Sequence, residues 1–472
     1  MEITSHRFKD NAAKALDDAI LQIALKRATK AFTSRRKTAV EALDNFEDLR
    51  HYCARVKAHT LDYLDHYLEQ LVAQIETLGG KVHFAADAAE ANAIVTQLCQ
   101  EKGVKTVAKS KSMVSEEILL NDALEAAGVK PIETDLGEYI LQIDHDYPSH
   151  IIGPAIHKTK EQITALFHEK LGTPADADIP TLTAAARKTL RQAFLEADMG
   201  ITGVNFAVAE TGTLVMVENE GNIRFCNSYP PIHLAIMGLE KLVPRLRDLS
   251  AFLTLLPRSA TGQKSSSYVS MITGPKRPED LQGPQELHVL IIDNGRSQVL
   301  ADPRLRAALR CIRCGACLNS CPVYQQVGGH AYGWVYSGPI GAILDPGLLG
   351  LAGTKHLPSA SSLCGACGEV CPVKIPIPEL LLEHRKRAVE RDLTPKAESL
   401  MIGAFAFLAK RPGLWDMGTK AARFGAQFLT DDGFLRGAYL PVLGQWLKER
   451  DFPAPAKRSF KEIWRDKLKE GS

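Results

Sequence analysis

Seven of the ten cysteines in this 472-residue chain lie between residues 311 and 371. Cysteine thiolates bind zinc and iron–sulfur clusters, and in a reducing compartment grouped thiols are more typical of such sites than of disulfides. The three scattered residues, Cys53, Cys99 and Cys226, are typical of small apolar side chains in a core. The chemistry of the chain is therefore expected in residues 311–371.

The first four of these cysteines have the spacing C-x2-C-x2-C-x3-C-P, which is that of bacterial ferredoxins. They are Cys311, Cys314, Cys317 and Cys321, followed by Pro322. In this motif three thiolates bind one face of a [4Fe-4S] cluster, and the fourth thiolate binds the other cluster. The spacing therefore predicts two clusters rather than one.

The second group matches the last three positions of the same motif. It consists of Cys364, Cys367 and Cys371 before Pro372, and Ser361 stands where the first cysteine would be. The ferredoxin pattern assigns Cys311, Cys314, Cys317 and Cys371 to one cluster and Cys321, Cys364 and Cys367 to the other. The second cluster is then either [3Fe-4S] or a [4Fe-4S] cluster with a non-cysteine ligand. Ser361 has the right spacing for that ligand, although the sequence favours an ordinary loop serine.

Zinc is the main alternative, because four-thiolate zinc sites also use C-x2-C pairs. The x3-C-P ending, which occurs twice here, favours iron–sulfur clusters. We find no G-x-G-x-x-G after a strand and no G-x-x-x-x-G-K-[ST], so neither a dinucleotide nor a phosphate-loop nucleotide is predicted. An electron carrier of this kind needs a partner that performs the substrate chemistry.

The overall charge is balanced, with 57 Lys and Arg against 55 Asp and Glu. A net charge of +2 argues against nucleic acid as a partner. No apolar run reaches the roughly 18 residues that cross a bilayer, the best candidate being residues 400–409. The N-terminus is polar and lacks a signal core, so the expected location is the cytoplasm, with the periphery of the inner membrane face included.

The pattern of apolar residues predicts an α/β domain between two helical regions. Leu61, Leu64, Leu68, Leu71 and Ile75 have helical spacing. Beyond Gly79 and Gly80, strand-like and helical runs alternate, which is typical of a parallel sheet. The runs are 82–86, 88–102, 104–108 and 115–127, with further strands expected at 206–209, 213–217 and 288–292. The predicted divisions are 1–78 (helical), 79–300 (α/β), 301–392 (ferredoxin-type) and 393–472 (helical extension).

Several segments, together with the two cysteine motifs, resemble the lactate-utilisation iron–sulfur protein B family. They are residues 133–139 (ETDLGEY), 149–151 (SHI), 155–158 (AIHK), 206–213 (FAVAETGT), 328–334 (GGHAYGW) and 453–460 (PAPAKRSF). The likeness covers nearly the whole chain. It implies a lactate-utilisation (LUD) domain related in fold to the sugar-phosphate isomerase and CoA-transferase group, then a helical ferredoxin domain and a helical C-terminal extension.

The resemblance also implies two [4Fe-4S] clusters on the seven cysteines and a role in oxidation of L-lactate to pyruvate. The chain would carry electrons in a system with a cysteine-rich protein A and a second LUD-domain protein C, and pass them to a downstream acceptor. The CCG segments typical of protein A are absent here, which argues against this chain being the lactate-binding subunit. No residue is assigned a catalytic role.

Two other functions stay open. An electron carrier with twin motifs could serve glycolate or glycerol-phosphate oxidation instead. Alternatively, the α/β domain is itself an enzyme or a ligand-binding module, and the clusters are structural or regulatory.

Overall fold

The computed structural model describes residues 3–426, 428, 430, 431, 433–435, 450 and 452–470. The chain forms two compact units, Met1–Arg391 and Asp392–Ser472, and each is described by itself. The four divisions expected from the sequence stay a prediction.

The first unit begins with four helices. They are α1 (Phe8–Asp17), α2 (Ala19–Glu41), α3 (Phe46–Asp62) and α4 (Leu64–Thr77), after the short 3-10 helix η1 (Ser5–Arg7). The side chain of Asp18 accepts a hydrogen bond from the Leu21 N–H and caps α2. The apolar stripe predicted over 61–75 lies mostly on α4, where Leu71 and Ile75 are fully buried.

A six-stranded sheet forms the centre of this unit, and all of its strands are parallel, as the alternating pattern predicted. The strand order is β1-β10-β7-β4-β2-β3. The strands are β1 (Lys81–Ala85), β2 (Thr106–Lys109), β3 (Lys130–Glu133), β4 (Met199–Gly203), β7 (Ile232–Gly238) and β10 (Glu286–Ile292).

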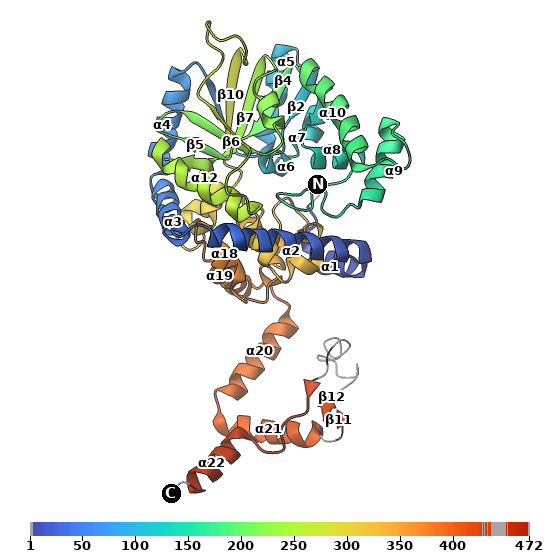
Figure 1. Ribbon diagram of the computed structural model, residues 1–472. Helices are drawn as coiled ribbons and strands as arrows, with labels where there is room; N and C mark the ends of the chain where they lie inside the picture. Colours follow the sequence, from blue (N-terminus) through green and yellow to red (C-terminus); the bar gives the residue numbers. More distant parts are fainter. Residues whose placement is uncertain are drawn as a thin grey trace. The chain divides into compact units, whose positions relative to one another are not determined.

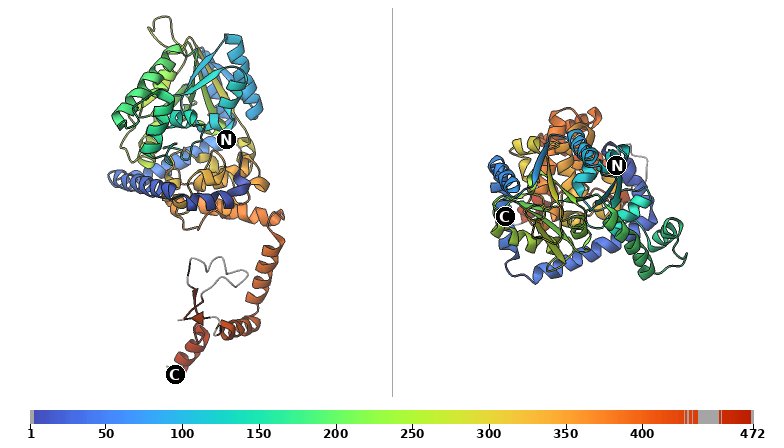
Figure 2. Two further views of the ribbon diagram at one scale, coloured as in Figure 1. Left: turned by 90° about the vertical axis from the view of Figure 1, so that its right-hand side faces the viewer. Right: turned by 90° about the horizontal axis from the view of Figure 1, so that it is seen from above.

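Both faces of this sheet are covered, so its strands are apolar on both sides. On β7, Ile232, Leu234 and Ile236 pack against helices α5 (Ala88–Lys102), α6 (Met113–Glu117) and α7 (Leu120–Ala126). The alternate residues Ala235 and Met237 pack against α4 and a second sheet. Figures 1 and 2 show this layered arrangement.

The second sheet has the order β8-β5-β6-β9. Its strands are β5 (Phe206–Val208), β6 (Thr213–Glu218), β8 (Leu242–Val243) and β9 (Tyr268–Ile272). Strands β5 and β6 are antiparallel and joined through Thr211 and Gly212, whose φ of 67° suits glycine at this turn. The Thr-Gly pair is therefore a hairpin connection.

One predicted helix differs from the structure. Residues 115–127 do not form one helix, because Leu119 has a φ of 55° and separates α6 from α7. The remaining helices of the α/β part are α8 (Leu136–Ile143), α9 (Lys160–Leu171), α10 (Ile179–Glu196), α11 (Asn222–Cys226) and α12 (Leu246–Ala260), with η2 (Leu239–Lys241) after β7.

The cysteine-rich region is built from short helices. They are α13 (Arg296–Ala301), η3 (Arg306–Arg310), α14 (Ala316–Ser320), α15 (Tyr324–Val327), η4 (His330–Tyr332), α16 (Gly338–Leu348), α17 (Leu351–Thr354), η5 (Leu357–Ser359), α18 (Ala366–Val370) and α19 (Ile377–Glu390). Helices α2 and α3 from the start of the chain pack against this region, and Figure 1 shows them beside α18 and α19.

The second unit contains α20 (Lys396–Ala409), α21 (Pro412–Ala426) and α22 (Phe460–Glu470). It also contains the short antiparallel strands β11 (Thr430–Asp431), β12 (Phe434–Leu435) and β13 (Phe452–Pro453), which the sequence did not predict. The apolar run 400–409 lies in α20. Among the described helices, none has the length and apolar character needed to cross a membrane.

Candidate metal centre and adjoining cavity

The two cysteine motifs have the same local backbone. Helices α14 and α18 each begin after a left-handed glycine, Gly315 (φ 73°) or Gly365 (φ 87°). Two residues before each glycine stands a second left-handed residue, Arg313 (φ 59°) or Leu363 (φ 57°). The chain thus adopts one cysteine-bearing loop twice, and the helices α14 and α18 that follow the two loops are in contact.

Four cysteines from both motifs line one small cavity. They are Cys311, Cys314, Cys317 and Cys371, here called the first thiol set, and the apolar side chains of Ile312, Ile340 and Ile375 surround them. The backbone N–H groups of Arg313 and Ile375 donate to the sulfurs of Cys311 and Cys371, at 3.4 and 3.3 Å. The arrangement brings Cys371 to the first three cysteines, although it is 54 residues beyond Cys317 in the sequence.

The other three cysteines, Cys321, Cys364 and Cys367, form a second thiol set. Burial and the nearby charge of Cys321 raise the pKa of Cys367 to about 11. Cys364 in turn raises the pKa of Cys321, after the larger effect of burial. Cys364 is the exposed member, and the N–H of Ala366 lowers its pKa. The second set therefore reaches the surface, whereas the first set is almost enclosed.

The donor chemistry of both sets fits iron–sulfur clusters. All ten cysteines are free thiols, so none of the seven is used in a disulfide. Burial raises the pKa of Cys314 to about 12, so this thiol would be neutral at pH 7 without a cation. A metal centre deprotonates thiols of this kind, and sulfur donors suit iron–sulfur clusters and zinc.

Ser361 occupies the place of the missing cysteine. Its hydroxyl oxygen accepts a hydrogen bond from the N–H of Leu363 at 3.1 Å. The sulfur of Cys311 accepts the equivalent bond from Arg313, two residues further along the chain in both motifs. The Ser361 oxygen therefore lies where a sulfur would lie in a complete second motif.

Two arginines of the N-terminal helices hold the second motif. The guanidinium of Arg50 on α3 donates to the carbonyl oxygens of Glu369 and Cys371, at 2.5 and 2.8 Å. Arg36 on α2 donates to the carbonyl of Val370 at 3.0 Å. These carbonyls end helix α18, where cations are favourable.

A buried ionic network links the first motif to the α/β domain. Arg313 pairs with Glu240 at 3.2 Å, and Glu240 pairs with Arg296 at 2.7 Å. Arg296 continues to Glu117 at 2.7 Å. Gly238 is needed beside this network, because a Cβ there would lie 2.2 Å from Glu240 and 2.4 Å from Arg296. Arg313, between two cysteines, is thereby fixed.

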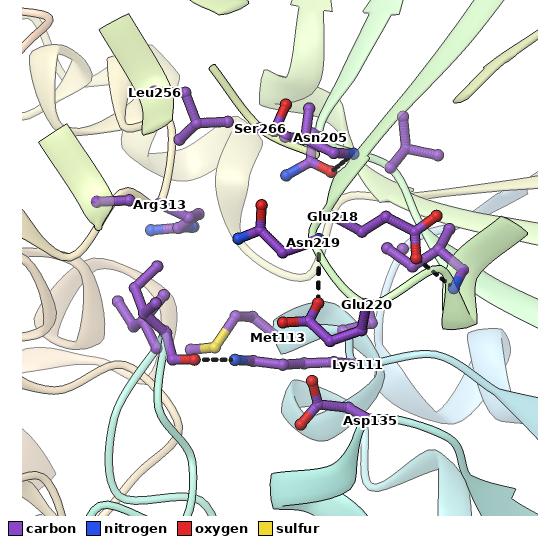
Figure 3. Close-up of a pocket in the computed structure, with 18 of the residues that line it drawn as sticks. Lys111, Met113, Asp135, Asn205, Glu218, Asn219, Glu220, Leu256, Ser266 and Arg313 are labelled. Carbon is purple, nitrogen blue, oxygen red and sulfur yellow. Dashed lines mark hydrogen bonds between the residues drawn. The ribbon is translucent and has the colours of Figure 1, made fainter. Parts of the chain in front are cut away.

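Arg313 also lines a second cavity, of about 220 Å³. We call it the switch-point cavity, because it lies at the carboxyl ends of β2 and β4, from which the chain continues in opposite directions across the main sheet. Its lining includes Lys111 and Asn205, which follow strands β2 and β4, and Lys241 after β7. Figure 3 shows Arg313 and Asn219 facing one another across this cavity, with Lys111 and Glu220 beside them.

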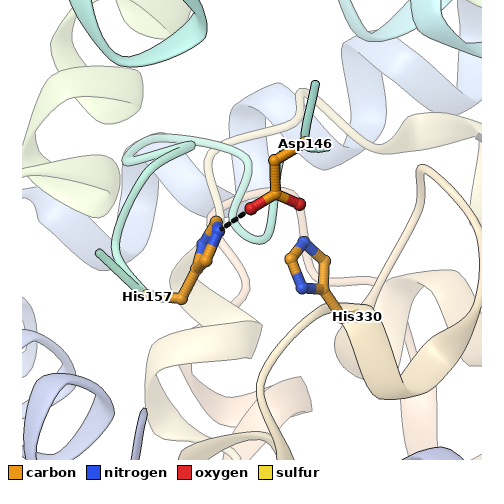
Figure 4. Close-up of side chains that lie close together, drawn as sticks. All are labelled: Asp146, His157 and His330. Atoms are coloured by element: carbon orange, nitrogen blue, oxygen red, sulfur yellow. Dashed lines mark hydrogen bonds and ion pairs between the residues drawn. The ribbon is translucent and has the colours of Figure 1, made fainter. Parts of the chain in front are cut away.

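Two further groups of polar side chains have possible metal-ligand atoms close together. Asp146, His157 and His330 lie close together (Figure 4), but Lys158 contacts Asp146 at 2.6 Å and supplies a cation. Glu116, Glu133 and Glu138 likewise surround the buried ammonium of Lys109, which lies 2.7 Å from Glu133. Neither His145 nor Asp144 belongs to the Asp146 group.

Comparison with known proteins agrees with this arrangement. Residues 68–292 match the LUD domain, 307–375 match the 4Fe-4S dicluster domain, and 385–469 match the lactate utilisation protein B C-terminal domain. Lactate utilization protein B of Bacillus licheniformis is 46% identical over 100% of this chain and 98% of its own length. The chain belongs to the lactate utilization protein B family.

Other members of the family also match over most of the chain. Lactate utilization protein B of Bacillus subtilis is 45% identical over 99% of this chain and 98% of its own length. That of Geobacillus thermodenitrificans is 48% identical over 93% and 92%. Among solved structures, a DUF162 family protein from Deinococcus radiodurans is 14% identical, with a TM-score of 0.26, over 48% of this chain and 98% of that one.

The sequence did not single out the charged residues around the first motif. Arg313 lies inside the first motif, between Cys311 and Cys314, but its spacing predicts no role for it. Lys241 and Glu240 follow an apolar strand, but nothing local marks them as neighbours of the cysteines. Only the fold brings them together.

Proposed function

We propose that the chain carries electrons in the oxidation of L-lactate to pyruvate, between a partner that oxidises lactate and a downstream acceptor. Membership of the lactate utilization protein B family and the match to a 4Fe-4S dicluster domain support this role. Bound iron–sulfur clusters would supply one-electron transfer.

We further propose that the first thiol set holds one [4Fe-4S] cluster and the second thiol set holds the other. The observation that carries this assignment is the shared cavity of Cys371 with Cys311, Cys314 and Cys317. Because Cys371 comes from the second motif, the pairing is crossed, as in ferredoxins with two clusters.

Ser361 is proposed as the fourth ligand of the second cluster. The equivalent hydrogen bonds at Ser361 and Cys311 support this proposal over an ordinary loop serine. A serine oxygen would complete the ligand set without a [3Fe-4S] centre.

The difference in exposure between the two thiol sets is consistent with electron transfer from one cluster to the other. Cys364 is exposed and gives a partner access to the second thiol set. The two sets are close, because helices α14 and α18, which carry Cys317 and Cys367, are in contact. The first set is enclosed by apolar side chains, which exclude water from it.

Proteins A and C of the lactate-utilisation system are the proposed partners, and the cytoplasm, including the inner membrane face, is the proposed location. A relation of the α/β domain to sugar-phosphate isomerases and CoA-transferases belongs to the same proposal.

Iron, acid-labile sulfide and low-temperature EPR on the anaerobically purified protein test the clusters. We expect about eight irons per chain with matching sulfide. The substitutions Cys311→Ala and Cys364→Ala should each alter a different EPR signal, and Cys99→Ala, a buried cysteine outside both sets, should alter neither. Zinc without sulfide, or loss of the same signal in both variants, would contradict the assignment.

A further inference from the structure

Three glutamates line a cavity of their own at one edge of the main sheet. Glu133 is the last residue of β3, Glu138 lies in the first turn of α8, and Glu116 lies on α6. Their carboxylate oxygens lie within 4.8 Å of one another. The cavity has a volume of about 190 Å³, and we call it the glutamate cavity.

The buried ammonium of Lys109 balances only part of the charge of these glutamates. It lies 2.7 Å from Oε1 of Glu133 and 3.2 Å from Oε1 of Glu116. Among the described residues, no other cationic side chain forms an ion pair with the three carboxylates, and Glu138 forms none at all. Three carboxylates and one ammonium would leave two negative charges without a counter-charge.

Three oxygen atoms in the lining of the cavity are buried and have no hydrogen-bond partner. They are Oε2 of Glu133, Oε2 of Glu138 and Oδ1 of Asn121. Glu133 and Glu138 are only 3% and 5% exposed. Asn121 is held beside Glu133, because its amide nitrogen donates to Oε1 of that residue at 2.8 Å. Buried acceptors normally have a partner, so these oxygens indicate a missing donor or cation.

The electrostatics of Glu138 agree with a missing cation. Burial and the charge of Glu133 raise the pKa of Glu138 well above its ordinary value. A carboxyl group behaves in this way when it is taken out of water without a counter-charge.

We propose that the glutamate cavity binds one divalent cation through Glu116, Glu133 and Glu138. The two positive charges would balance the two negative charges that Lys109 leaves. Carboxylate and amide oxygens are the ligands that Mg²⁺, Mn²⁺ and Ca²⁺ prefer, and Asn121 and water would complete the set. The side chain of Glu116 is 22% exposed, which gives the ion a path from solvent.

This site goes beyond the proposed electron transfer and does not depend on it, because no cysteine lines the cavity. The three glutamates belong to α6, β3 and α8. A bound cation would therefore join three elements and stabilise the folded chain by mass action.

Titration with Mn²⁺ tests the proposal on the full-length, anaerobically purified protein, after a chelating resin has removed divalent metals. Room-temperature EPR measures the free Mn²⁺. We expect one Mn²⁺ to bind per chain with a dissociation constant below about 1 mM. Mg²⁺ or Ca²⁺ should displace it, whereas K⁺ at the same ionic strength should not. Bound Mn²⁺ should also raise the unfolding midpoint.

The substitution Glu138→Gln should weaken Mn²⁺ binding at least tenfold, because it removes a charged ligand. Without metal this variant should be no less stable than the unaltered protein, since it removes a buried carboxyl group that has no partner. Glu116→Gln provides a second test if Glu138→Gln does not fold. Glu125→Gln is the matched control, because Glu125 lines the same cavity but is exposed and lies outside the group of three.

Three results would overturn the proposal. The first is the absence of Mn²⁺ binding at about 10 mM. The second is unchanged affinity in the glutamate variants that fold. The third is an equal loss of affinity in Glu125→Gln, which would indicate a general attraction of cations to acidic side chains rather than a built site.

Discussion

At the scale of single residues, some functional side chains can be recognised from the sequence, and others can be recognised only from the fold. The seven cysteines are evident from their spacing alone. Arg313, Glu240 and Lys241 acquire their surroundings only when strand β7 is placed beside the cysteine-rich region. Ser361 is an intermediate case. Its position in the motif is evident from the sequence, but its hydrogen bond with the N–H of Leu363 is known only from the structure.

Ser361 provides the first prediction. The substitution Ser361→Ala should remove one ligand and convert the second cluster to a [3Fe-4S] centre, with a loss of about one iron per chain and a new EPR signal in the oxidised protein. Ser361→Cys should retain the iron and change the EPR spectrum of the reduced protein. Ser359→Ala, at an exposed position just before this loop, is the control. An iron content and spectrum unchanged in Ser361→Ala would show that Ser361 is not a ligand.

His233 provides a prediction about pH. Burial lowers its pKa to about 3, whereas in the unfolded chain the pKa would be about 6.5. The unfolded state therefore binds a proton that the folded state does not, and stability falls as the pH decreases from 6.5 towards 3. This residue alone contributes a slope of up to about 1.4 kcal/mol per pH unit.

His233→Gln, which can keep the hydrogen bond to Thr202, should make the unfolding midpoint less dependent on pH in that range. His66→Gln, at an exposed position on α4, is the control and should not change the dependence. Parallel pH profiles for His233→Gln and the unaltered protein would argue against this contribution.

At the scale of secondary-structure elements, helix α3 holds the second motif. Arg50 contacts the carbonyls that end α18, and α18 carries Cys367. Removing this arginine leaves buried carbonyls without donors, which costs about 1–3 kcal/mol. The cysteines of the second motif should then be less firmly positioned.

We expect Arg50→Gln to lose iron to a chelator several times faster than the unaltered protein, as followed by absorbance. Arg55→Gln is the matched control, because Arg55 is an exposed residue of the same helix. Equal rates for both variants would show that Arg50 does not hold the motif.

The elements were predicted well where their patterns are local. Alternating strands and helices gave the parallel sheet, and β1, α5 and β10 lie within two residues of their predicted ranges. The division of residues 115–127 into α6 and α7 was missed, because a left-handed leucine has no signature in the sequence. The strands β11 to β13 were also missed, since each has only two residues.

At the scale of the whole molecule, the α/β domain and the cysteine-rich region form one compact unit. The network from Glu117 through Arg296 and Glu240 to Arg313 joins them. The sequence could not indicate this union, because the paired residues are up to 179 positions apart.

The proposed electron transfer makes a prediction for the whole molecule. L-lactate alone should not reduce the purified chain, because no residue of it is assigned to lactate oxidation. Addition of proteins A and C should permit reduction, seen as bleaching of the visible absorbance under anaerobic conditions. Reduction by lactate without partners would show that this chain oxidises lactate itself.

The packing of α2 and α3 against the cysteine-rich region has a consequence for biosynthesis. A ribosome releases these helices first, yet Arg36 and Arg50 bind carbonyls at residues 369–371. Such long-range contacts form late. The newly made chain must therefore reach about four-fifths of its length before this part can close. The cysteines of the two motifs are made only at the end of that interval, so they emerge before α2 and α3 have packed against them and would then be open to the machinery that delivers iron and sulfide.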